Sequence, residues 1–123
     1  MMTAILYYCV VYPLSLLPLW ILYGLSDLVF LLFMSILPYR KKVVQINIEN
    51  SFPDLSPRDQ AVLVRGFYRH FSDLLIESIK NLSISREELV RRMKVLNPEV
   101  LQELEKKGKS VLFVSGHFNN WEW

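Results

Sequence analysis

The near absence of charge in the first third of the chain is the feature that most constrains its fold. Residues 1–39 carry one charged side chain, Asp27, whereas residues 40–123 carry all 14 lysines and arginines and 11 of the 12 acidic residues. A segment so apolar must be buried in protein or in a bilayer, because exposing apolar area to water costs free energy. The chain therefore combines an apolar front with a body of ordinary charge.

Within the apolar front, residues 19–37 form a long stretch without proline. As a helix they would span about 28 Å, close to the hydrocarbon thickness of a bilayer. Trp20 and Tyr23 lie near one end and Tyr39 lies just past the other, where aromatic residues of membrane helices gather. We therefore expect a membrane-associated segment over residues 1–39, with its main helix, a transmembrane helix by length, at 19–37.

The basic cluster Arg40, Lys41 and Lys42 follows this segment at once. Because basic residues accumulate on the cytoplasmic side of membrane segments, the sequence predicts that residues 40–123 begin a cytoplasmic domain and that the cluster contacts anionic lipid. Asp27 is expected to face protein or water, since a charge facing lipid costs a few kcal/mol. A cleaved signal peptide fits less well, because no basic residue precedes the segment and no small-residue cleavage site follows.

Charge and cysteine content exclude several classes of protein. The net charge of +2 is too low to indicate nucleic acid as a main partner. The single cysteine, Cys9, excludes an intrachain disulfide and lies in the apolar segment, where a small buried or lipid-facing residue is the simplest interpretation.

Helical patterns fill most of the charged body. Ser56, Pro57 and Asp59 are typical of a helix start, and residues 57–82 place apolar side chains on one face and charged ones on the other. On the charged face Arg69 and Asp73 are one turn apart and are expected to pair. Further helices are predicted over residues 40–52, 85–94 and 97–108.

A short apolar run, residues 111–114, follows these helices. Its two valines and lack of polar residues are typical of a strand buried on both faces of a parallel sheet. The expected fold class is therefore α/β: an N-terminal membrane helix, several amphipathic helices and then the first core strand. One strand is not a sheet, so we expect the remaining strands to lie outside these 123 residues.

His117 and Glu122 come directly after this run, at the position where open α/β sheets place their active sites. An imidazole can take the proton of a hydroxyl, and a carboxylate can orient it and stabilise the imidazolium. Regular helix would rotate the two apart by about 140°, so the pairing needs a turn between them, which Asn119 and Asn120 favour, while Gly116 allows the close turn after the run. From the spacing alone, a structural histidine beside a surface glutamate is the commoner arrangement, and no third residue suggests a metal site.

The stretch GHFNNWEW at residues 116–123 resembles the H-F-x-N-W-E block of the bacterial lipid A biosynthesis acyltransferases of the late, lauroyl or myristoyl, type. The similarity continues upstream, in order, through nearly the whole chain. It includes VQIN at 44–47, SFPD at 51–54, the helix with Phe67, Phe71 and Glu77, and KGKSVLFVS at 107–115.

This resemblance implies an enzyme that moves a fatty acyl chain from acyl carrier protein to a hydroxyl of a lipid A precursor. The reaction would take place at the cytoplasmic face of the bacterial inner membrane and would need no cofactor. By position in the motif, His117 would be the general base and Glu122 its charge-relay partner, with direct attack on the thioester and no acyl-enzyme.

Two departures from the family pattern qualify the resemblance. Asn119 stands where the family usually has glycine, so its side chain could crowd the turn. Family members are also much longer, and we therefore expect this chain to be their N-terminal part, incomplete at its C-terminus and inactive alone. The alternatives are a glycerolipid-type acyltransferase and a short, non-catalytic, membrane-anchored binding protein.

Overall fold

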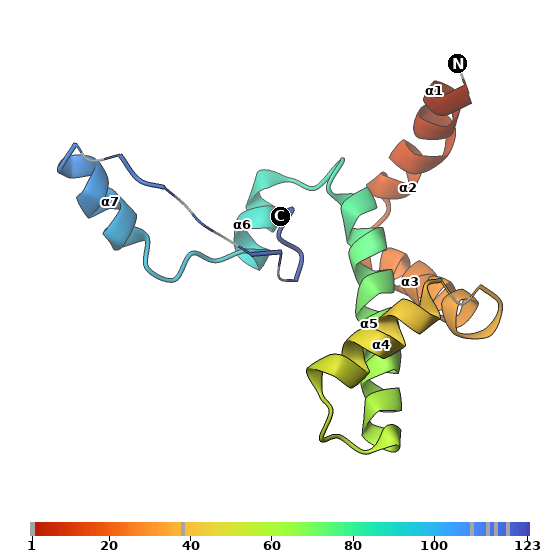
Figure 1. Ribbon diagram of the computed structural model, residues 1–123. Coiled ribbons are helices and arrows are strands. Elements are labelled where there is room, and N and C mark those ends of the chain that lie inside the picture. The colour runs from red at the N-terminus through yellow and green to blue at the C-terminus, as the bar shows by residue number, and fades with distance from the viewer. Residues whose placement is uncertain (1, 38, 109, 113, 115, 118) are drawn as a thin grey trace. The chain divides into compact units, whose positions relative to one another are not determined.

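The computed structural model describes every residue except 1, 38, 109, 113, 115 and 118 (Figure 1). It divides into two compact units, Met1–Ser83 and Ile84–Trp123. All regular structure in the described part of the chain is helical.

The predicted α/β fold is therefore wrong for the residues that the structure describes. Val111, Leu112 and Val114 belong to no strand and are 48, 88 and 84% exposed, and Phe113 lies outside the described residues. A strand needs a neighbour to pair its backbone N–H and C=O groups, and no described segment supplies one. An apolar run alone does not form a strand without that partner.

The N-terminal unit begins with one helical arm in three pieces: α1 (Met2–Leu6), a π-helical turn η1 (Tyr7–Val11) and α2 (Tyr12–Leu16). In the π-turn the Tyr12 N–H donates to Tyr7 O, five residues back. Pro13 explains the widening, because it lacks an N–H and its ring clashes with the carbonyl four residues earlier.

The arm ends at Leu17, whose extended backbone (ψ 148°) is the conformation that a following proline imposes. Helix α3 (Leu19–Ser35) then leaves at a bend of 118° from the first arm, Thr3–Leu16.

At 17 residues α3 is shorter than the predicted 19–37 helix. Among the described helices none alone is long and apolar enough to cross a membrane, but this bent pair together meets the criterion of length and composition.

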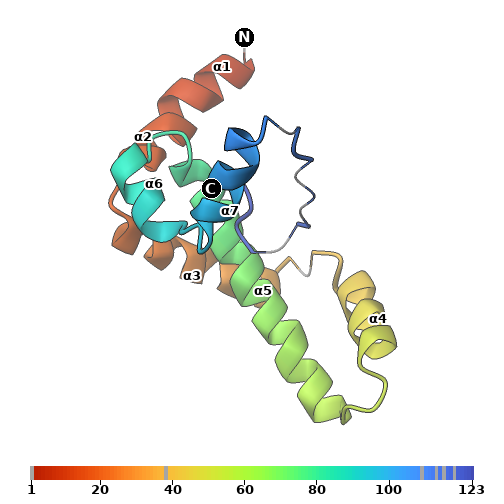
Figure 2. The same cartoon turned by 90° about the vertical axis from the view of Figure 1, so that its left-hand side faces the viewer.

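Helix α5 (Pro57–Lys80) packs against α3, and α4 (Lys41–Ser51) connects to its start through a turn (Figure 2). The Ser56 cap predicted from sequence is confirmed, since its Oγ accepts the Asp59 N–H at 3.2 Å. The buried apolar residues of the described chain all come from the α3–α5 pair: Leu22, Phe30, Tyr68 and Ile76.

Polar pairs also join α3 to α5, which the amphipathic pattern of α5 did not predict. They are Tyr23 to Glu77 at 2.6 Å, Ser26 to Asp73 at 2.5 Å, and the ion pair Asp27 to Arg69. As residue numbers rise along α3 they fall along α5, so the helices are antiparallel. Arg69 thus pairs with Asp27 of α3, and not with Asp73 of its own helix as we expected. Asp27 faces protein, as expected.

The C-terminal end of α5 and the turn after it contact the bend between the first arm and the second arm, α3. Lys80 Nζ donates to Ser15 O at 2.9 Å and to Leu17 O at 3.1 Å, and Ser83 Oγ donates to Ser15 O at 2.5 Å. These are carbonyls at a helix end, which lack intrahelical partners and favour a nearby cation. The bend is therefore stabilised by Lys80 of α5 and by Ser83 in the turn after it, as well as by Pro18.

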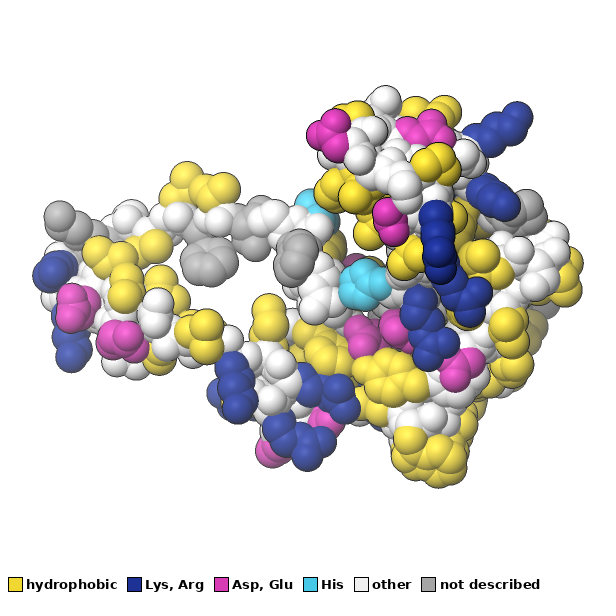
Figure 3. Space-filling model, turned by 90° about the horizontal axis from the view of Figure 1, so that it is seen from below, with side chains coloured by type: hydrophobic (Ala, Val, Ile, Leu, Met, Phe, Trp, Pro, Cys, Tyr) yellow, Lys and Arg dark blue, Asp and Glu magenta, His cyan; other side chains and the backbone are white. Residues whose placement is uncertain are grey.

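Apolar side chains remain exposed on both arms of this unit. The space-filling view shows one face of the molecule, on which hydrophobic side chains lie on either side of a run of basic side chains (Figure 3). A soluble monomer rarely exposes so much apolar surface, and such surface marks a contact with membrane or protein. The residues of the arms more than half exposed are Ile5, Leu6, Tyr8, Leu16, Trp20, Leu28 and Leu31.

The C-terminal unit contains α6 (Arg86–Arg92) and α7 (Pro98–Lys106), and then an irregular segment. Ser85 caps α6 by accepting the Glu88 N–H at 3.2 Å, as the sequence predicts. Gly108 follows α7 with φ +62°, a left-handed conformation that glycine adopts without strain. This unit carries the residues predicted to be catalytic.

Candidate active site

The candidate site is the turn that carries His117 and Glu122. Asn119 has φ +55°, in the left-handed region that asparagine tolerates, and the Trp121 N–H donates to Asn119 O at 3.1 Å. The predicted turn is therefore present, and asparagine adopts at this position the conformation that favours glycine. A left-handed residue breaks the helical path between His117 and Glu122. Along a regular helix the two side chains would point about 140° apart.

The His117 ring lies edge-on against the Trp121 indole. The ring centroids are 4.5 Å apart, and the planes meet at 76°, a favourable edge-to-face geometry. The tryptophan of the N-W-E block thus restricts the orientation of the imidazole. His117 is exposed, so the imidazole is accessible to a substrate.

Helix α6 contacts the C-terminal end of the same turn through Arg92 and Trp123. The Arg92 guanidinium carbon lies 5.3 Å from the centre of the Trp123 ring, within cation–π range. Arg92 is itself bound to Glu88 at 2.7 Å, and hydrogen bonds from Arg91 and Arg92 lower the pKa of Glu88. The capped helix α6 therefore anchors the segment that carries His117.

Glu122 follows Trp121 in this turn and is exposed. The structure thus brings both predicted residues onto one short loop, and their roles as base and partner stay predictions. Phe118 of the motif lies outside the described residues. Within the described part of the chain no three His, Cys, Asp or Glu side chains are grouped to hold a metal ion.

Comparison with known families identifies the family of the chain that carries this turn. The family of bacterial lipid A biosynthesis acyltransferases matches the chain over residues 1–123. The chain belongs to this family. Individual curated proteins and solved structures give no match. Membership of this family implies an acyltransferase role in lipid A biosynthesis, with an acyl donor, a lipid A-type acceptor and association with a bacterial membrane.

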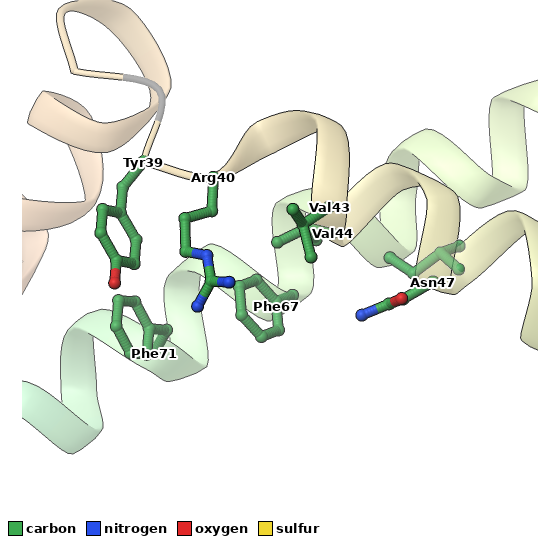
Figure 4. A pocket seen from close by; sticks show the side chains of 8 residues that line it. Tyr39, Arg40, Val43, Val44, Asn47, Phe67 and Phe71 are labelled. Carbon is green, nitrogen blue, oxygen red and sulfur yellow. The ribbon is translucent and has the colours of Figure 1, made fainter.

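Sequence reasoning missed a cavity of about 470 Å³ between α4 and α5 of this acyltransferase (Figure 4). Its walls are apolar and aromatic, and Arg40 contributes a cationic group. No sequence signal predicted this cavity, because the periodicity of each helix does not show how α4 and α5 pack together. The lining residues are Tyr39, Arg40, Val43, Val44, Asn47, Ile48, Phe67 and Phe71.

Proposed function

We propose that this acyltransferase moves a fatty acyl chain from acyl carrier protein to a hydroxyl of a lipid A precursor, with His117 as general base. The observation that carries the proposal is the H-F-x-N-W-E turn, with Asn119 left-handed, in a chain that the family matches over residues 1–123. Glu122, on the same turn, is the proposed partner of His117.

In this mechanism His117 removes the proton from the acceptor hydroxyl as its oxygen attacks the thioester carbonyl. The C–O bond forms, the carbonyl oxygen becomes an oxyanion, and the carbon–sulfur bond then breaks. The imidazolium returns its proton to the departing thiolate, so the products are an acyl ester and free acyl carrier protein. Glu122 stabilises the imidazolium between these two steps, as a carboxylate does in hydrolase triads.

We further propose that the apolar arms enter the bacterial inner membrane and that residues 40–123 lie on its cytoplasmic face. Two features support this placement. The arms expose large apolar side chains, and the basic cluster Arg40, Lys41 and Lys42 follows them directly. Such a placement would bring His117 to the side of the membrane where acyl carrier protein is found.

The proposal is tested by competition between acceptors. Membranes containing the whole gene product are supplied with acyl carrier protein bearing a radiolabelled acyl chain. A lipid A precursor and a glycerol phosphate acceptor are offered together, and the label in each product is counted. We expect label in the lipid A precursor, and more from acyl carrier protein than from coenzyme A.

Other outcomes separate the alternatives. Label mainly in the glycerol phosphate product would indicate a glycerolipid-type acyltransferase. Acceptor binding without label in any product would indicate a non-catalytic binding protein. Label that stays covalently on the protein would contradict direct transfer, because that mechanism forms no acyl-enzyme.

A further inference from the structure

The cavity between α4 and α5 has the composition of a lipid site. An aromatic cluster forms one side, with Tyr39 and Phe71 stacked at 5.9 Å and Phe67 and Phe71 stacked at 5.7 Å. Val43 and Val44 of α4 face it from the other side. Such walls bind a hydrocarbon chain, because moving its methylene groups out of water is favourable.

The aromatic wall of the cavity continues into the apolar segment through ring contacts. The Phe33 ring of α3 lies 5.8 Å from the Phe71 ring and 6.1 Å from the Tyr39 ring. The aromatic wall is therefore shared with the helix that exposes apolar side chains to its surroundings. The ring contacts thus place the aromatic wall of the cavity beside the apolar segment that we propose enters the bilayer.

Positive charge gathers at one end of the cavity. Figure 4 shows the Arg40 side chain reaching from the start of α4 toward Phe67 and Phe71. An adjoining hollow is lined by Arg40, Lys41 and Lys42, and neither lining includes an acidic residue. The N-terminal end of the 11-residue helix α4 adds partial positive charge at the same place.

We propose that this cavity binds one anionic glycerophospholipid of the bilayer. Its phosphate lies at Arg40, Lys41 and Lys42, and one acyl chain lies between α4 and the Phe67–Phe71 face of α5. A zwitterionic lipid with the same chains binds less well, because its ammonium group meets the basic cluster. This lipid is neither donor nor acceptor of the acyl group, so the inference does not depend on the proposed reaction.

The test uses photoactivatable lipids with the protein in phosphatidylcholine nanodiscs. Phosphatidylglycerol and phosphatidylcholine carrying the same diazirine acyl chain are compared, and adducts are mapped by mass spectrometry. We expect phosphatidylglycerol to label residues 39–48 and 67–71, and unlabelled phosphatidylglycerol to compete. Arg40→Gln should lower this labelling about five-fold, the effect of one basic residue near an anionic lipid.

One variant that fills the cavity and one control variant outside it complete the test. Val44→Trp fills the cavity and should abolish the labelling with circular dichroism unchanged. Arg58→Gln removes an exposed charge outside the lining and should leave the labelling as it was. Equal labelling by both lipids, no adduct in these two segments, or equal losses in the two arginine variants would overturn the proposal.

Discussion

Replacing His117 by alanine should lower the rate of acyl transfer about 10²- to 10⁴-fold, the usual contribution of a general base. The loss should appear in kcat, because the base acts on the hydroxyl proton after the acceptor has bound. The rate is measured on the whole gene product, with labelled acyl carrier protein and a lipid A precursor. Glu122→Gln should give a smaller loss, since the imidazole remains and only its partner changes.

The chain provides a matched control for this prediction. His70 is its other histidine, lies exposed on α5 and is not part of the candidate site. His70→Ala should leave the rate unchanged. A His117→Ala enzyme that keeps more than about a tenth of the activity would remove His117 from the role of general base.

Replacing Tyr68 by alanine should lower the free energy of unfolding by about 3–5 kcal/mol, as for other large aromatic residues removed from a core. Tyr68 is 1% exposed and its hydroxyl donates to Tyr39 O at 2.6 Å. Burial also raises the pKa of this hydroxyl, so it remains a neutral donor at physiological pH. Denaturant unfolding in detergent, followed by circular dichroism, measures the change.

Two further variants separate the contribution of the Tyr68 hydroxyl to stability from that of its ring and provide a surface control. Tyr68→Phe keeps the ring and leaves Tyr39 O without this donor, so it should cost about 1–2 kcal/mol. Val62→Ala changes a residue of α5 that is 63% exposed and should stay within about 0.5 kcal/mol of the original protein. Equal stability of Tyr68→Ala and Val62→Ala would show that α3 and α5 do not pack through Tyr68.

Local sequence signals predicted the helix starts and the turn of the site well. The caps at Ser56 and Ser85 depend on residues three apart, which meet wherever a helix begins. The turn after His117 likewise depends on Asn119, whose side chain tolerates a left-handed backbone. Such features need no information about the rest of the fold.

Features that depend on distant partners were predicted poorly. The run at 111–114 has strand composition, but pairing comes from elsewhere, and no described segment provides it. Likewise the charged face of α5 does not lie wholly in water, because Ser26 and Asp27 of α3 offer it partners. Nothing in the periodicity of either helix shows that these polar groups meet, nor that α4 and α5 enclose a cavity.

The mass of lipid A from the bacterium that makes this protein tests its function most directly. Lipid A is compared between the parent strain, a strain without the gene, and that strain carrying either the intact gene or its His117→Ala form. The predicted result is that lipid A loses the mass of one acyl ester without the gene. The intact gene should restore the mass and His117→Ala should not. Lipid A of unchanged mass in the strain without the gene would contradict a role as its acyltransferase.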